Sequence, residues 1–120
     1  MAKFDENPLD TNFAICEHSR RMWVISRARL REFWERHAAA ETRLRGWYQI
    51  VEAADWSGWE DLRRAFPSAD RVGRLTVFNL GGNAYRLVAR VEYDKHRVYI
   101  RRVMTHQEYD ANEWTNDPWF

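Results

Sequence analysis

The chain has 120 residues, of which 45% are hydrophobic and 31% charged, a length and composition that suit one domain with a single core. No apolar run approaches the roughly 20 residues that cross a bilayer. The first residues carry acids without a sustained apolar stretch, so we expect neither a membrane span nor a secretory signal. The single cysteine, Cys16, cannot form an internal disulfide, which fits the reducing cytoplasm. Its spacing from the histidines does not suggest zinc, so we expect no metal and no cofactor.

The net charge of +1 conceals an uneven distribution of charge along the chain. Between Asp70 and His106, eight Lys or Arg side chains stand against three acids, whereas residues 107–120 contain four acids and no base. A concentrated positive region is typical of proteins that bind a polyanion such as RNA. Two other interpretations stay open: arginines that prevent pairing at a sheet edge, and a docking surface for an acidic protein.

Residues 1–21 show no periodicity and predict a loosely ordered arm or extension. A short strand is expected at Met22 to Ser26, and Met22 is a plausible alternative start. We expect the folded domain to span residues 22–114, with residues 115–120 as a C-terminal tail.

Three helices are predicted after this strand. Ser26 is a good N-cap for the first helix, and the second helix runs from about Ala40 to Ala54. A short third helix has Ser57 as a candidate cap and ends at Pro67. Eleven residues, all but His37 aromatic or aliphatic, recur at helical spacing in these helices: Leu30, Phe33, Trp34, His37, Leu44, Trp47, Tyr48, Val51, Trp59, Leu62 and Phe66. Aromatic stripes at such spacing are usually core, so we expect burial of Trp34, Trp47, Trp56 and Trp59.

Three antiparallel strands complete the pattern, at Val72 to Leu80, Ala84 to Tyr93 and Arg97 to Thr105. The turn at Gly81-Gly82-Asn83 is a strong hairpin signal because it supplies residues that tolerate positive φ. The next turn is Asp94-Lys95-His96. The predicted fold is therefore α+β, a two-layer β-α-α-(α)-β-β-β arrangement with a small antiparallel sheet and helices on one face.

Alternation of side chains along the middle strand divides its residues between two faces. The apolar face, expected to lie against the helices, contains Tyr85, Leu87, Ala89, Val91 and Tyr93. Arg86 and Arg90 then point outward on an uncovered face. The last strand divides in the same way. One face is apolar except for Arg102 and contains Val98, Ile100 and Met104. The other face contains Arg97, Tyr99, Arg101 and Val103.

These outward arginines suit a phosphate ligand. Arg86 and either Arg101 or Arg102 lie on neighbouring strands and can hold one phosphate group together. Alternatively, they pair with nearby acids or with the acidic C-terminal residues. Beside them, His106 and Tyr109 stand three residues apart, where a turn directs both to one side. Five further candidates for RNA binding are Asn79, Asn83, Arg90, Lys95 and Arg97, although an ordinary turn explains Asn83 better.

Two segments resemble a known family, the HigB branch of the RelE-like toxins. They are VFNLGGNAYRLVARV (Val77 to Val91) and YIRRVMTHQEYD (Tyr99 to Asp110), and FPSAD and MWVISRARLREFWERH fit the same family. The resemblance implies helices packed on a small antiparallel sheet, in the toxin component of a type II toxin-antitoxin system. It also implies an endoribonuclease that cleaves mRNA in the ribosomal A site. The partner implied is a helix-turn-helix antitoxin, HigA. The toxin is expected to contact operator DNA only through this antitoxin.

In this family, Arg86 matches the arginine on the middle strand, and the end of the last strand supplies His106 and Tyr109. Cleavage of RNA without a metal then proceeds by attack of the 2′-hydroxyl. Arg86 with Arg101 or Arg102 holds the scissile phosphate, His106 is the better base, and Tyr109 is the better acid or positioner. The alternative is a module that binds RNA or the ribosome without cleaving.

Overall fold

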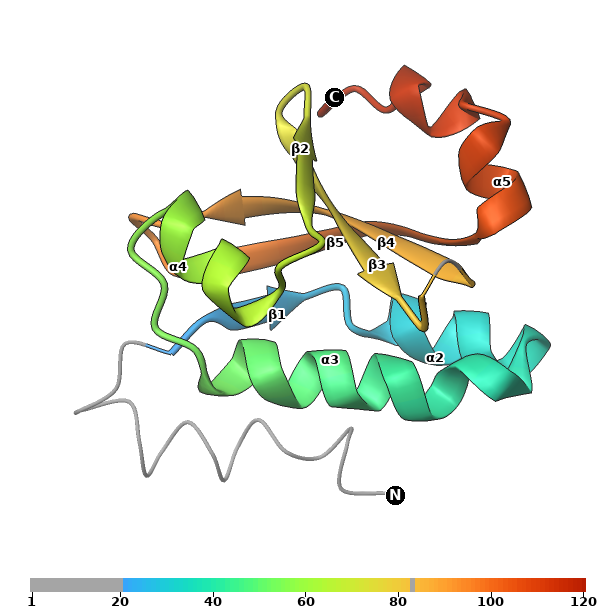
Figure 1. Ribbon diagram of the computed structural model, residues 1–120, viewed down its shortest axis with the longest axis horizontal. Coiled ribbons are helices and arrows are strands. Elements are labelled where there is room, and N and C mark those ends of the chain that lie inside the picture. Colours follow the sequence, from blue (N-terminus) through green and yellow to red (C-terminus); the bar gives the residue numbers. More distant parts are fainter. Residues whose placement is uncertain (1–20, 83) are drawn as a thin grey trace.

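The computed structural model describes residues 21–82 and 84–120, so residues 1–20 of the predicted arm and the candidate Asn83 lie outside the described residues. The fold is α+β, as predicted, with a five-stranded mixed sheet and helices (Figure 1). The elements in chain order are β1 (Trp23–Ile25), α2 (Ala28–Arg36), the 3-10 turn η1 (Ala38–Ala40), α3 (Glu41–Ala53), α4 (Trp59–Ala65), β2 (Asp70–Val72), β3 (Leu75–Leu80), β4 (Tyr85–Glu92), β5 (Arg97–Thr105), α5 (His106–Asp110) and the 3-10 turn η2 (Glu113–Asn116).

The strands lie in the order β1-β5-β4-β3-β2. β1 pairs in parallel with the start of β5, and the other neighbours are antiparallel. The strand predicted at Val72 to Leu80 is confirmed over β3 but is not continuous. A tight turn at Gly73, with φ +62°, leaves Val72 in β2 and forms the hairpin β2–β3. The turn between β3 and β4 is the expected one, and Gly81 and Gly82 both adopt positive φ there.

Two predicted helix caps are also wrong. Ser26 adopts φ +72° and lies outside the helix, and the N-cap of α2 is Arg27, which makes no side-chain cap. The N-cap of α4 is Gly58 rather than Ser57. Instead, the Ser57 amide and hydroxyl donate to the carboxylate of Asp61 in the first turn. The helices themselves lie where they were expected, because their long apolar stripes depend on burial more than on capping.

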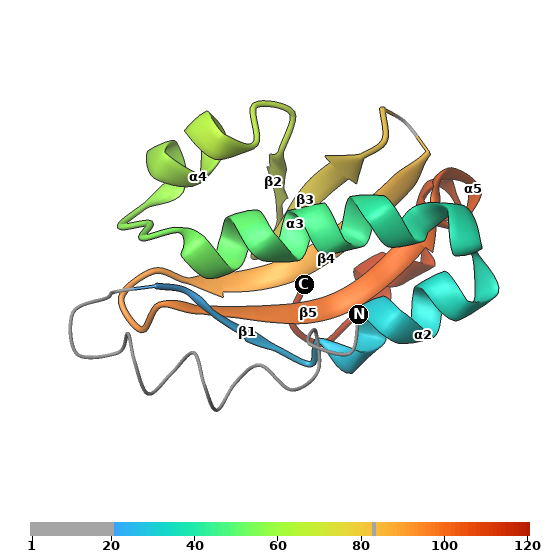
Figure 2. The same cartoon turned by 90° about the horizontal axis from the view of Figure 1, so that it is seen from below.

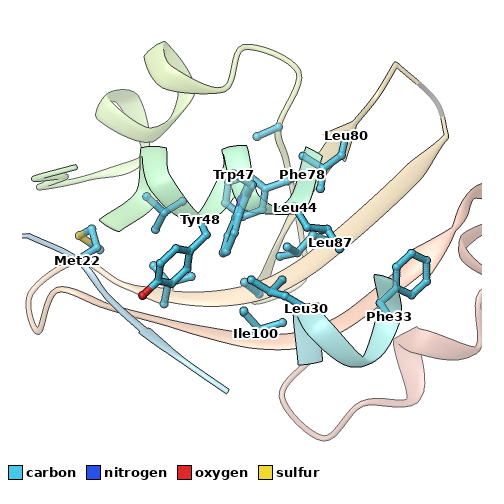
Figure 3. Close-up of a cluster of buried hydrophobic side chains, with 14 of the residues drawn as sticks. Met22, Leu30, Phe33, Leu44, Trp47, Tyr48, Phe78, Leu80, Leu87 and Ile100 are labelled. Carbon is cyan, nitrogen blue, oxygen red and sulfur yellow. The ribbon is translucent and has the colours of Figure 1, made fainter. Parts of the chain in front are cut away.

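The main core lies between the sheet and the helices on one face. α2 and α3 cross this face, as seen from below in Figure 2. Trp47 of α3 packs edge-to-face on Phe78 of β3, with 5.4 Å between ring centroids. Around this pair lie Leu30, Leu44, Leu87 and Ile100, which are at most 1% exposed (Figure 3). The predicted apolar face of the middle strand is confirmed, because Leu87 and Ala89 belong to this core and the other three residues, Tyr85, Val91 and Tyr93, pack against it.

The opposite face of the sheet is not uncovered, and that prediction is wrong. The chain turns back after β5, and the C-terminal residues cross this face (Figure 1). A second, smaller cluster forms there, with Trp114, Trp119 and Phe120 packed against residues that point away from the helices: Leu75, Val77, Val88 and Met104. The predicted tail, residues 115–120, therefore contributes to this second cluster.

A β-bulge in β5 changes the predicted alternation of its side chains. Val88 of β4 pairs with Arg102, but the next residue, Ala89, pairs with Ile100, so Arg101 is an extra residue in the ladder. A bulge of this kind shifts the alternation by one position beyond it. Val103 consequently packs against the main core and Met104 against the second cluster, the reverse of the predicted sets.

Candidate active site

Three of the predicted site residues lie together on the second face of the sheet. The Arg86 guanidinium lies 3.3 Å from the Nδ1 atom of His106 (Nη2 to Nδ1) and 5.1 Å from the centroid of the Tyr109 ring. An arginine, an imidazole and a phenol are thus grouped within contact distance. These groups supply a cation, a proton acceptor and a weak acid at one place.

The local structure that positions these groups starts at the end of β5. Thr105 caps α5 with a capping box: its hydroxyl accepts from the Glu108 amide, and the Glu108 carboxylate accepts from the Thr105 amide. The His106 amide donates to the carbonyl of Ala84, the residue before β4, 3.1 Å away. Because Tyr109 follows three residues later on the same helix, it lies on the same side as His106.

The hydrogen bonds of His106 define its tautomer. A guanidinium can only donate, so Nδ1 of His106 must accept from Arg86 and carries no proton. The proton of the neutral ring is therefore on Nε2, which lies 3.1 Å from the carboxylate of Asp110. Asp110 thus orients the imidazole from the opposite side.

Arg86 is more buried than predicted. It is only 8% exposed, because Tyr109 covers its guanidinium and the C-terminal residues cover the strands around it. The His106 side chain is 46% exposed, so the group is open to solvent on the histidine side. The side of the guanidinium next to the imidazole is therefore the one at which we expect a phosphate to approach.

Arg101 lies in a second group, with Asp117 and Trp119. Its Nε and Nη2 atoms donate to the two Asp117 carboxylate oxygens at 3.1 and 3.0 Å, a bidentate pair. The Trp119 ring lies 4.1 Å from its guanidinium carbon. Desolvation raises the pKa of Asp117, whereas the hydrogen bonds from Arg101 and from the Trp119 amide lower it. The lowering is the larger effect, so the pKa of Asp117 lies below its usual value. Arg101 pairs with the acidic C-terminal residues, the alternative left open by the sequence.

Arg102 differs from its neighbour, because its side chain is exposed. Both arginines line an open groove of about 580 Å³ between α2 and the C-terminal residues. Other arginines and several acids share this lining: Arg29, Arg36, Glu32, Glu108, Glu113 and Asp117. Arg102 is therefore the better candidate of the two for a second contact to phosphate.

The other predicted RNA contacts are spread along the sheet. Asn79 pairs in register with Arg86, but its amide donates to the Ser68 carbonyl at 3.0 Å. Arg90 pairs with Glu92 at 3.4 Å and stacks near Trp119. Two more, Lys95 and Arg97, lie at the turn end of the β4–β5 hairpin, and His106 follows the opposite end.

Comparison with known proteins decides the family. A family model described as "HigB_toxin, RelE-like toxic component of a toxin-antitoxin system" matches residues 40–112. The mRNA interferase toxin HigB of Escherichia coli K12 and the mRNA interferase HigB of Shigella flexneri are each 36% identical over 92 residues, covering 74% of this chain and 88% of theirs. The mRNA interferase HigB of Escherichia coli O6:H1 is 28% identical over 92 residues, 74% of this chain and 89% of its own.

The chain belongs to the HigB family. The resemblance seen in the sequence is thereby confirmed. The relatives are named mRNA interferases, which are endoribonucleases, the class of enzyme that the resemblance implied. Membership in a family of toxic components of toxin-antitoxin systems also implies a cognate antitoxin. The catalytic and RNA-binding roles of individual residues stay predictions.

Sequence reasoning missed two residues of this HigB-family chain that shape the site, Trp114 and Asp117. Trp114 is 2% exposed and stacks on Tyr109, and Asp117 is 7% exposed and binds Arg101. A signal was present, because Trp114, Trp119 and Phe120 crowd three large aromatic residues into a short stretch. Such a stretch indicates burial rather than a solvated tail.

Two features are absent from the described residues. Among residues 21–82 and 84–120, no cluster of three or more His, Cys, Asp or Glu side chains could hold a metal ion. Over the same ranges, no helix is long and apolar enough to cross a membrane.

Proposed function

We propose that this HigB-family chain is an mRNA endoribonuclease that uses Arg86, His106 and Tyr109 and needs no metal for the reaction. One observation carries the proposal: the Arg86 guanidinium contacts both the His106 imidazole and the Tyr109 ring. The names of the relatives, mRNA interferases, supply the substrate class. The concentration of positive charge between Asp70 and His106 also suits an RNA ligand.

Binding of RNA prepares the base in this proposal. In the free protein, Nδ1 of His106 accepts a hydrogen bond from Arg86. A phosphate oxygen that takes over the Arg86 donors leaves Nδ1 free to accept the proton of the neighbouring 2′-hydroxyl. Asp110, which lies 3.1 Å from Nε2, then stabilises the imidazolium that forms. Dependence on the 2′-hydroxyl explains why the substrate is RNA rather than DNA.

The bond changes follow from these roles. The 2′-oxygen attacks phosphorus, the bond from phosphorus to the 5′-oxygen breaks, and the products are a 2′,3′-cyclic phosphate and a free 5′-hydroxyl. Arg86, joined by the exposed Arg102, stabilises the extra negative charge of the transition state. Tyr109 protonates the leaving 5′-oxygen, because at neutral pH a phenol donates a proton more readily than it removes one.

The partners follow from the family. We propose that the substrate is mRNA in the ribosomal A site, which positions the codon and places the chain in the cytoplasm. We propose further that the antitoxin is a HigA-like helix-turn-helix protein, and that the chain contacts operator DNA only through it. The simplest support for the pair is an adjacent reading frame that encodes such a protein, together with co-purification of its product with this chain.

The test is to express the chain from a tightly controlled promoter and to map mRNA ends. We expect growth arrest with new ends that carry 5′-hydroxyls. Arg86→Ala should reduce cleavage by about 10²–10³-fold, since it removes a preorganised donor to the transition state. His106→Gln should have a comparable effect. The matched control is Arg64→Ala, because Arg64 lies on α4, with its side chain 71% exposed, and is expected to leave cleavage unchanged.

The burial of Arg86 favours one second candidate, a module that binds RNA without cleaving it, in which this arginine is structural. That candidate predicts salt-sensitive RNA binding without defined ends. Growth arrest with unchanged transcripts would contradict nuclease action. Loss of cleavage in Arg86→Ala, with an unchanged circular dichroism spectrum, would favour the catalytic role.

A further inference from the structure

Trp114, on η2 beyond the residues matched by the family model, holds Tyr109 in the candidate active site. We infer that Trp114 is a positioning residue for Tyr109, and that residues 113–120, here called the C-terminal segment, are therefore needed for cleavage. The inference rests on the proposed function, because it assigns Trp114 a role in that same reaction.

Two different contacts join Trp114 to Tyr109. The two rings stack, with 5.2 Å between centroids and an interplanar angle of 16°. In addition, the indole Nε1–H of Trp114 donates to the carbonyl oxygen of Tyr109 at 3.2 Å. The Tyr109 ring thus lies in contact with the Arg86 guanidinium and with the Trp114 indole, while its backbone is held by the same indole. Ring and backbone are both restrained.

The helix that carries Tyr109 cannot supply this restraint itself. α5 has only five residues, and a helix of that length is not stable in water without tertiary contacts. Its first turn is secured by the Thr105 capping box, but Tyr109 lies at the other end. Asn112 then reverses the chain with φ +67°, and its amide also donates to the Tyr109 carbonyl at 3.0 Å. The last turn of α5 is therefore held from the C-terminal side.

Trp114 is itself held firmly. It is 2% exposed, and Phe120 packs edge-to-face against it at 5.7 Å. Asp117 links the C-terminal segment to β5 through its bidentate pair with Arg101. At the far end, the backbone oxygen of Phe120 accepts from the Arg74 amide at 2.9 Å. The C-terminal segment is thus fastened to both β5 and the β2–β3 turn, which makes Trp114 a fixed platform.

A displacement of about 1 Å of a reacting group can lower a rate by about 10²-fold. We therefore expect Trp114→Leu, which removes both the stacking surface and the indole donor, to lower kcat by about 10²-fold with KM nearly unchanged. Trp114→Phe keeps an aromatic surface and loses only the indole donor, so it should recover most of the activity. The control is Leu75→Ala, because Leu75 belongs to the same cluster but lies on β3, two strands from β5.

The experiment uses the full chain and measures cleavage of mRNA on purified ribosomes, with unfolding curves for each variant. A second readout is independent of activity: the ring signals of Tyr109 in protein with 13C-labelled tyrosine, assigned with Tyr109→Phe. Stacking on an indole shifts these signals, so they should move in Trp114→Leu and change less in Trp114→Phe. If Trp114→Leu does not fold, the Tyr109 ring signals decide in its place: they should move more in Trp114→Phe than in Leu75→Ala, and equal shifts would overturn the positioning role.

Three outcomes are distinct. A wild-type chain that folds but does not cleave overturns the proposed function, whatever the Tyr109 signals show. A wild-type chain that cleaves, with Trp114→Leu losing no more activity than Leu75→Ala, overturns the positioning role alone. An increase of cleavage in Trp114→Leu or Asp117→Asn also overturns it, because the C-terminal segment would then obstruct the site rather than support it.

Discussion

The two faces of the sheet differ in how they are covered and in what they carry. One face lies under α2 and α3 and packs aromatic and aliphatic side chains into the larger core (Figures 1 and 3). The other face lies under the C-terminal segment, where apolar residues alternate with Arg86, Arg90 and Arg101. The first face contributes most of the buried apolar side chains. The second face holds the candidate active site and has the smaller cluster.

The second face shows how arginines are accommodated among apolar residues. Each of these three guanidiniums lies near the face of an aromatic ring, Tyr109 for Arg86 and Trp119 for Arg90 and Arg101. A guanidinium can stack through its plane while its edge keeps hydrogen-bond donors available. The aromatic residues after β5 therefore let a charged surface be partly covered without leaving the charges unsatisfied.

The largest expected effect compares one leucine from each face. Leu87→Ala in the larger core should destabilise the fold by about 3–4 kcal/mol, and Leu75→Ala in the smaller cluster by about 2–3 kcal/mol. The smaller cluster offers fewer buried neighbours for the leucine side chain to lose, which reduces the cost. Urea unfolding followed by circular dichroism measures both. An equal loss from the two substitutions would remove the distinction between the faces.

A smaller effect concerns the ion pair that fastens the C-terminal segment. Asp117→Asn should destabilise the fold by about 1–2 kcal/mol at pH 7, since the Arg101 side chain is 22% exposed and water partly compensates its lost partner. Because the pKa of Asp117 is lowered in the folded state, its contribution is present above the ordinary Asp pKa of about 3.9. That contribution is lost as the pH falls through the lower, folded-state pKa.

Unfolding curves of the wild type and of Asp117→Asn between pH 7 and pH 2 test this sign. The difference in free energy of unfolding should be constant above about pH 5 and should shrink toward acid pH. A difference that grows as the pH falls would contradict the assigned ion pair. The His106–Asp110 pair is unaltered in both proteins, so its contribution cancels in this comparison.

The smallest effect compares two glycines with similar backbone angles. Gly73 and Gly82 have φ +62° and +68°, so an alanine at either position is strained by about 1 kcal/mol. At Gly73, the added Cβ would also lie 2.7 Å from the backbone oxygen of Phe120, whereas nothing lies within 4 Å at Gly82. We therefore expect thermal unfolding to show Gly73→Ala as the less stable variant by roughly 1 kcal/mol. Equal stability would mean that Phe120 does not dock at this turn.

Sequence reasoning worked best where the pattern is periodic or local. The apolar stripes of α2 and α3 and the alternation along β4 identify the larger core, because burial on one side imposes a period on the sequence. The same alternation failed in β5, where the extra residue Arg101 shifts the register beyond it. A bulge leaves no periodic trace, so Val103 and Met104 were assigned to the wrong faces.

The sequence by itself determined the family, the α+β class and the placing of Arg86, His106 and Tyr109 near the end of one hairpin, since motifs and strand periods are local properties. Only the tertiary structure decided that the C-terminal segment folds back over the second face. That arrangement buries Arg86, engages Arg101 with Asp117 and stacks Trp114 on Tyr109. These contacts join the end of the chain to strands that are distant in the sequence. They are stabilised by burial and charge pairing between those distant residues, so no local sequence pattern indicates them.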